Sequence, residues 1–163
     1  RSTEQLEALL TNTDLCAVEL DVQSLLDSNQ RQELLQLAAE QLDQALSDGQ
    51  DAVLYTSRKL VRADSAQASL NIGQQVSAEL VQVVKQLVIS PRYLVAKGGI
   101  TSSDVATQAV GIRRAMVLGQ ILPGVPVWQP GVESRYPGMP YIVFPGNVGD
   151  RDSLVKIRKI LSP

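Results

Sequence analysis

Residues Tyr93–Asp104 read YLVAKGGITSSD, a β-type run that passes through two glycines and several hydroxyl residues into an expected helix. Glycines let backbone N–H groups come close to a ligand because no side chain lies in the way. The helix start that follows carries N–H groups without intrahelical partners and a partial positive charge. The segment therefore predicts an anion site, and phosphate is the obvious biological candidate.

A second turn, Pro145–Gly149, repeats this layout between an expected strand, Tyr141–Phe144, and an expected helix, Asp152–Leu161. Two such turns at the same edge of one parallel sheet would face each other across a crevice. The alternative interpretation is that each is an ordinary strand-to-helix turn, with Ser103 or Asp104 as a helix N-cap. Neither turn matches the P-loop or the Rossmann fingerprint.

Strand and helix patterns alternate along the rest of the chain. Further strands are expected at 15–22, 52–56, 93–96 and 114–122, and further helices at about 29–46, 66–89 and 102–110. A turn with a short extension is expected at 123–128, and an irregular loop at 130–140. This alternation favours parallel strands joined by right-handed crossovers. We expect an α/β fold of three layers, a mostly parallel sheet with helices on both faces, Rossmann-like but without the dinucleotide fingerprint.

Length and composition narrow the possible functions. The 163 residues suit one domain, and the formal net charge of −2 without a basic tract argues against extended nucleic-acid contact. The chain has no histidine, which excludes histidine-based catalysis and histidine metal sites. Its single cysteine, Cys16, has apolar neighbours and is expected to be a small core residue. No membrane span or signal peptide is apparent, so a cytoplasmic location is the default expectation.

Individual residues in and near the two turns suggest specific roles. Thr101 and Ser102 are well placed to donate hydroxyl hydrogen bonds to a phosphate. Lys97 is either a point charge for that phosphate or a surface lysine. Asp104 and Asp150 are weak candidates to orient a magnesium-bound water, and we prefer to interpret them as first-turn helix acids. The remaining candidates are the flexible turn residues Gly98, Gly99, Gly146, Asn147 and Gly149.

Together these segments resemble the C-terminal nucleotide-binding domain of the four-carbon acid sugar kinase family, which includes 3-oxo-tetronate, threonate and erythronate kinases. The resemblance covers nearly the whole chain. It rests on the order and spacing of four segments: Ser2–Gln5 before the strand 18–22, Gly98–Thr101, Pro123–Pro126 and Gly146–Gly149.

The resemblance implies a role for the chain and its site. Residues 1–163 would be a single C-terminal domain of a two-domain kinase, with residues 1–14 as a possible linker or inter-domain segment. Gly98, Gly99, Ile100 and Thr101 would hold the phosphates of ATP, and the turn at Gly146 would close the nucleotide site from the other side. The cofactors would be ATP and Mg²⁺.

The implied reaction is transfer of the γ-phosphoryl group of ATP to a hydroxyl of a four-carbon acid sugar. The sugar and the catalytic base would come from an N-terminal domain, so the chain alone is expected to bind nucleotide weakly and to turn over nothing. The oligomeric state is open, with a homo-oligomer among the options. The rival interpretation is a non-catalytic regulatory or scaffold domain that binds a phosphorylated metabolite. A nicotinamide-dependent oxidoreductase fits less well, because its fingerprint is absent.

Overall fold

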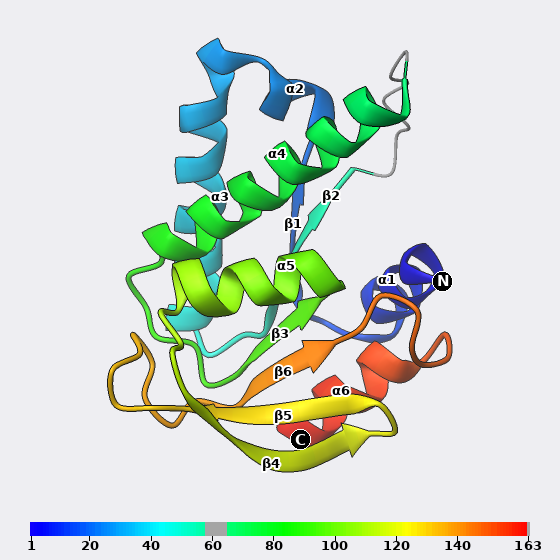
Figure 1. Ribbon diagram of the computed structural model, residues 1–163, viewed down its shortest axis with the longest axis vertical. Helices are drawn as coiled ribbons and strands as arrows, with labels where there is room; N and C mark the ends of the chain where they lie inside the picture. The colour runs from blue at the N-terminus through cyan, green and yellow to red at the C-terminus, as the bar shows by residue number, and fades with distance from the viewer. Residues whose placement is uncertain (58–64, 163) are drawn as a thin grey trace. The chain divides into compact units, whose positions relative to one another are not determined.

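The computed structural model describes residues 1–57 and 65–162. These residues form two compact units, each with its own sheet (Figure 1). We call Cys16–Ile89 the central unit, and Arg1–Leu15 with Ser90–Pro163 the terminal unit. Within the described ranges, no helix is both long and apolar enough to cross a membrane.

The central unit packs three helices against a two-stranded parallel sheet. The strands are β1 (Cys16–Leu20) and β2 (Ala52–Thr56), and the helices are α2 (Val22–Leu26), α3 (Ser28–Ser47) and α4 (Ala66–Gln86). Its core consists of these apolar residues at sheet and helix spacing: Val18, Leu20, Leu25, Leu35, Ala38, Ala39, Leu42, Val83 and Leu87. Cys16 packs against this core, as expected. Gly49, with φ +74, lies just beyond the end of α3, as is common at helix C-termini.

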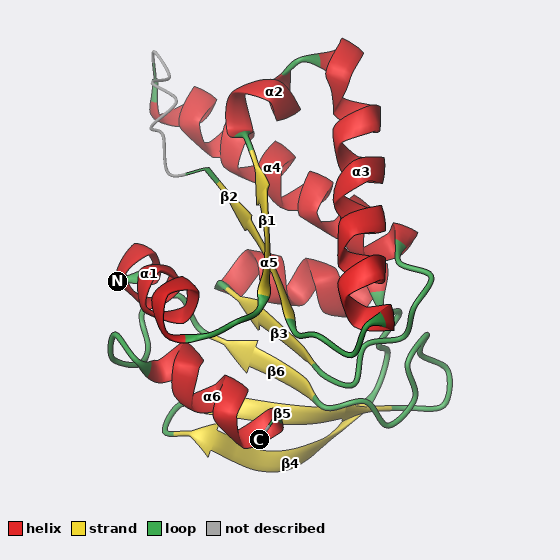
Figure 2. Ribbon diagram, turned by 180° about the vertical axis from the view of Figure 1, so that it is seen from behind, coloured by secondary structure: helices red, strands yellow, loops and turns green. Residues whose placement is uncertain are grey.

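The terminal unit contains a four-stranded sheet in the order β3-β6-β5-β4. The strands are β3 (Leu94–Lys97), β4 (Ala115–Leu122), β5 (Val125–Pro130) and β6 (Tyr141–Phe144). The helices are α1 (Ser2–Asn12), α5 (Gly99–Asp104) with the π-helical turn η1 (Val105–Ala109), and α6 (Ser153–Leu161). Figure 2 shows α1 beside α6 and α5 next to β3.

Side chains of β6 alternate between the two faces of this sheet and so define three layers. On one face, the hydroxyl of Tyr141 donates a 2.6 Å hydrogen bond to the carbonyl of Ser102 in α5. On the other face, Ile142 and Phe144 form an apolar cluster with Ile157 of α6. Because successive strand residues point in opposite directions, one short strand anchors helices on both sides.

The predicted α/β fold class, with open sheets and helices around them, is confirmed. The pairs β1–β2 and β3–β6 are parallel, but β5 pairs antiparallel with both β4 and β6. The reversal has a local cause: Pro123 and Gly124 connect β4 to β5, and two residues cannot make the crossover that a parallel pair needs. The extension expected at 123–128 is therefore the second strand of a hairpin.

Several boundaries differ from those expected. The helix predicted from Ser102 begins at Gly99, which places Asp104 at the end of α5 rather than in its first turn. Helix α4 ends at Gln86 rather than at residue 89. The N–H groups of Val88 and Ile89 donate to the Asp43 carboxylate instead of continuing the helix. Residues 2–12, whose place the sequence left open, form helix α1 of the terminal unit.

Candidate functional site

The two glycine turns lie side by side at one edge of the terminal sheet. Strands β3 and β6 are parallel neighbours whose register pairs Lys97 with Phe144, the last residue of each strand. The N–H of Gly98 donates a 2.8 Å hydrogen bond to the carbonyl of Phe144. A Cβ atom added to Gly146 would lie 3.9 Å from the Cα of Gly98. The backbones of the two turns therefore approach each other with almost nothing between them.

Two of the four glycines are required by the fold. Gly98 has φ +109 and Gly149 has φ +81, values that residues with a side chain rarely adopt. A Cβ on Gly149 would also lie 2.5 Å from Oγ of Ser153 and 3.1 Å from Cζ of Phe144. These glycines allow sharp bends and close packing, whether or not a ligand binds.

The other two glycines leave space instead. A Cβ added to Gly99 would have no atom within 4 Å, and one added to Gly146 would meet only the Cα of Gly98 at an ordinary contact distance. Neither residue has a positive φ. The fold would therefore accept a side chain at both positions, but that side chain would occupy the open side of the turns.

Several backbone donors of the two turns are available to a ligand. Across residues 1–57 and 65–162, no protein acceptor receives the N–H groups of these residues: Gly99, Ile100, Gly146, Asn147 and Gly149. An amide donor without a partner is stable only where water or a ligand can reach it. Ile100 is 66% exposed. Because its side chain is apolar, only its backbone N–H is suited to bind phosphate.

Positive charge gathers beside these donors. Nζ of Lys97 lies 4.0 Å from the centroid of the Phe144 ring and 3.4 Å from the carbonyl oxygen of Pro145. No carboxylate in the described ranges forms an ion pair with it. Burial, and secondarily the positive charge of Arg1, hold the pKa of Lys97 below the ordinary lysine value. An anion bound here would relieve both effects.

The hydroxyl candidates have different surroundings. Ser102 is only 3% exposed, and its Oγ donates a 3.1 Å hydrogen bond to the carbonyl of Gly99. Its hydroxyl therefore closes the first turn of α5 from within. Thr101 is half-buried, with Oγ1 3.8 Å from the position of a Cβ on Gly98. Of the two side chains, Thr101 lies closer to the bend.

The two acidic candidates do not form a metal cluster. The Asp150 carboxylate accepts hydrogen bonds from Nζ of Lys156 (2.6 Å), from Oγ of Ser153 (2.8 Å) and from the N–H of Asp152 (3.1 Å). The first two contacts are the main causes that lower the pKa of Asp150. Among the residues that the structure describes, no three acidic or sulfur ligands come together as a metal site.

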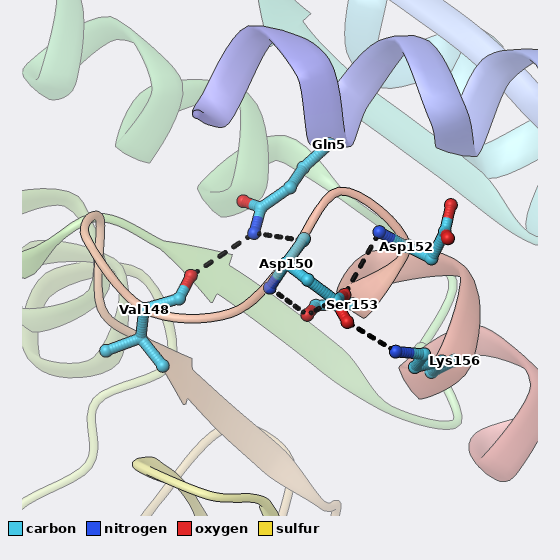
Figure 3. A network of polar contacts seen from close by, with 6 residues as sticks. All are labelled: Gln5, Val148, Asp150, Asp152, Ser153 and Lys156. Atoms are coloured by element: carbon cyan, nitrogen blue, oxygen red, sulfur yellow. Dashed lines mark hydrogen bonds and ion pairs between the residues drawn. The ribbon is translucent and has the colours of Figure 1, made fainter.

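Residues missed by the sequence analysis hold the second turn from behind (Figure 3). Gln5 of α1 donates hydrogen bonds to the carbonyls of Val148 and Asp150, and the guanidinium of Arg1 donates to the carbonyl of Asn147. A polar residue four positions before Leu9, on the buried face of an amphipathic helix, is the signal that could have pointed to Gln5.

Trp128 is half-buried in the terminal unit. It lies opposite Tyr141 across the β5–β6 pair, and the two rings stack with centroids 6.1 Å apart. The turn between β4 and β5 also contacts the site: a Cβ on Gly124 would lie 3.4 Å from Val148. The third segment of the family resemblance therefore supports the second glycine turn.

Comparison with known proteins identifies the family. A family model described as "Nucleotide-binding C-terminal domain" matches residues 1–154. The chain belongs to this family. The predicted relationship to C-terminal nucleotide-binding domains is therefore confirmed. No curated protein sequence matches the chain.

Solved structures share the fold of this nucleotide-binding domain. A domain of unknown function (DUF1537) from Bordetella bronchiseptica, a domain-swapped dimer with bound citrate, is 17% identical with a TM-score of 0.69. A Salmonella typhimurium LT2 protein, provisionally named a tRNA synthase, is 22% identical with a TM-score of 0.67. A Haemophilus influenzae DUF1537 protein is 21% identical with a TM-score of 0.64. The matches cover 98% of this chain but only 37–38% of those chains.

Proposed function

We propose that the chain is the ATP-binding domain of a cytoplasmic kinase that transfers the γ-phosphoryl group of ATP to a hydroxyl of a four-carbon acid sugar. One observation carries the proposal. Two glycine turns end adjacent parallel strands at one edge of the sheet. Open backbone donors lie there beside Lys97, which has no ion pair with a described carboxylate. Membership of the nucleotide-binding C-terminal domain family supports the choice of ligand.

The chemistry assigned to this chain is positioning and charge neutralisation, because phosphoryl transfer requires little covalent chemistry from the protein. The amides of Gly99, Ile100, Gly146, Asn147 and Gly149 would bind phosphate oxygens. The positive charge of Lys97 would neutralise part of the phosphate charge, and the bound phosphate would in turn offset the burial and the Arg1 charge that lower the pKa of Lys97. Gly98 and Thr101 would shape the first turn, and Ser102 would close it from within.

Mg²⁺ would be held chiefly by the phosphates of the bound nucleotide and by water, since magnesium usually needs only one or two protein carboxylates. When bound, it supplies neutralisation of the phosphate charge. Asp104 and Asp150 are the carboxylates nearest in sequence to the two turns, and Asp150 is the weaker candidate because Lys156 and Ser153 already engage it.

The remaining parts of the reaction belong to the longer protein. The chain spans less than two fifths of the solved structures that it matches. We therefore place the acid sugar and the catalytic base in an N-terminal domain. We interpret residues 1–163 as one C-terminal domain. The reaction would take place at the interface of the two domains. The oligomeric state stays open in this proposal, and a homo-oligomer is one option because one solved structure with this fold is a domain-swapped dimer.

A titration with ATP and Mg²⁺ tests the ligand, followed by calorimetry and by the fluorescence of the single tryptophan, Trp128. The Gly99→Val variant should fold normally and lose binding, because its side chain enters space that the fold leaves open. Gly73→Val is the matched control: Gly73 also has open space around it, but in helix α4.

The result separates the two functions. Saturable ATP binding that Gly99→Val removes and Gly73→Val retains would support the kinase domain. Preference for a sugar phosphate over ATP would favour the regulatory domain instead. If neither ligand binds, the proposed function is wrong.

A further inference from the structure

We infer that Gln5 is a positioning residue for the nucleotide site: its side-chain amide holds the second glycine turn in the shape that directs backbone donors toward the phosphates. The inference rests on the proposed function, since the turn must bind an anion for its shape to matter. Gln5 itself lies behind the turn and would not touch the nucleotide.

The contacts of Gln5 are unusual for a polar residue on a short helix. It is 0% exposed, and its Nε2 donates hydrogen bonds to the carbonyl of Val148 at 3.2 Å and to that of Asp150 at 2.8 Å (Figure 3). A primary amide has two N–H donors, and these two bonds use both of them. One side chain therefore fixes two backbone carbonyls on either side of Gly149.

Peptide geometry converts these contacts into an orientation of the donors. In a planar trans peptide the carbonyl and the following N–H point in opposite directions. The carbonyl of Val148 points at Gln5 on α1, so the N–H of Gly149 must point away from α1. That N–H has no acceptor among the described residues, as a ligand-binding donor requires.

A second side chain, from Arg1 at the N-cap position of α1, acts on the same turn. The guanidinium of Arg1 donates to the carbonyl of Asn147, so side chains one helical turn apart bind the carbonyls of residues 147, 148 and 150. The helix thus takes up the acceptors of the turn. The N–H groups of Gly146, Asn147 and Gly149 have no acceptor among the described residues, and such donors are what an anion needs.

The carbonyl oxygen of the Gln5 side chain, Oε1, argues against a role in packing alone. This atom is buried and has no hydrogen-bond partner among the described residues. A buried acceptor without a donor lowers stability, so an apolar residue of similar length would pack here with less penalty. The amide therefore fits a requirement for its N–H groups.

The experiment measures the binding of ATP and of adenosine to Gln5→Leu in the presence of Mg²⁺. The wild-type chain of the same length is measured in parallel. Leucine keeps the apolar contacts of α1 and removes both hydrogen bonds. We expect ATP to bind about tenfold more weakly, the equivalent of about one lost hydrogen bond, while adenosine, which lacks phosphates, binds as before. Leu9→Ala is the control that loosens α1 without removing the amide, and it should lower the melting temperature but keep the ratio of the two affinities.

A second variant keeps the inference testable if Gln5→Leu does not fold. Glutamate at position 5 has the same shape, but its charged form offers only acceptors to the two carbonyls. ATP binding to Gln5→Glu, expressed relative to wild type at each pH, should be weak at high pH, where the carboxyl is charged despite its burial. It should recover at acidic pH, where the protonated carboxyl again donates a hydrogen bond.

The outcomes separate the two levels of the proposal. If the wild-type protein does not bind ATP, the proposed function fails. If the wild type binds ATP, and Gln5→Leu shows wild-type ATP affinity, Gln5 has no positioning role. The same conclusion follows from wild-type affinity of Gln5→Glu at high pH if Gln5→Leu does not fold. An equal loss of ATP and adenosine affinity would also overturn the inference, because it would indicate general damage to the fold.

Discussion

The two glycine turns have similar sequences and neighbouring positions, but they are held in different ways. The first turn, Gly98–Thr101, is fixed by nearby elements: the N–H of Gly98 bonds to β6, and Tyr141 holds the carbonyl of Ser102. The second turn, Gly146–Gly149, is held by the side chains of Gln5 in α1 and of Arg1 at its N-cap, more than 140 residues earlier. The first shape is therefore encoded by the sheet and its helix, and the second depends on a distant segment.

The largest expected effect is on the stability of the second turn. Gly149→Ala combines a positive φ with a Cβ placed 2.5 Å from Oγ of Ser153 and 3.1 Å from Cζ of Phe144. We expect it to lower the free energy of unfolding by about 3 kcal/mol, measured by chemical denaturation. A loss below about 1 kcal/mol would show that the second turn yields easily and is less fixed than its contacts suggest.

Gly146→Ala, in the same turn, should affect ATP binding without affecting the free energy of unfolding. The new methyl group meets only the Cα of Gly98 at 3.9 Å, so folding should change by less than about 0.5 kcal/mol. The methyl group would nevertheless occupy the open side of the turns, where a phosphate is proposed to bind. We expect ATP affinity, measured by calorimetry, to fall by about tenfold or more. Unchanged affinity would place the nucleotide elsewhere.

Tyr141→Phe tests the support of the first turn. Burial raises the pKa of the Tyr141 phenol, which keeps its proton and its hydrogen bond to the carbonyl of Ser102. Removing the hydroxyl should lower the free energy of unfolding by about 1–2 kcal/mol, measured by thermal or chemical denaturation. ATP affinity should fall less than in Gly146→Ala, because the sheet still holds Gly98. The reverse order of affinities would mean that the first turn is the less firmly held.

The smallest effect concerns Lys97 and pH. Because its folded-state pKa is lowered, Lys97 loses its proton in the folded protein at a pH where the unfolded chain still keeps it. The free energy of unfolding therefore rises as the pH increases from the pKa of Lys97 in the folded protein toward its pKa in the unfolded chain. ATP affinity should change in the opposite direction, falling several-fold across this alkaline window as the positive charge is lost.

Lys97→Arg provides the control for this titration, since arginine keeps its charge throughout. Its ATP affinity, measured by calorimetry over the same pH range, should be nearly constant. A parallel decline in the wild type and in Lys97→Arg would assign the pH dependence to another group.

Local patterns were enough to predict much of the fold. The strands 52–56 and 141–144 were found with their true boundaries, because short apolar runs between turn residues leave few alternatives. The second strand of the hairpin was harder to find. Pro126 and Pro130 obscured it, and a proline is compatible with a strand only where its missing N–H is not needed. The π-helical turn after Asp104 has no recognised sequence signal.

The candidate site was predictable to the extent that it is local. The expectation of parallel strands placed Gly98 and Gly146 at one edge, and the register of β3 and β6 explains why they meet. The contacts of Arg1 and Gln5 could not be predicted in the same way, because they depend on how α1 packs after the whole chain has folded. A single buried glutamine in an amphipathic helix gives no indication of its partners.

The position of α1 has a consequence for the order in which the protein forms during synthesis. Gln5 is synthesised before the whole central unit, and the carbonyls that it binds follow 143 and 145 residues later. The central unit needs nothing beyond residue 89 to complete its own contacts, so it can finish while translation continues. The second glycine turn, by contrast, cannot reach its final shape until residue 150 has been synthesised.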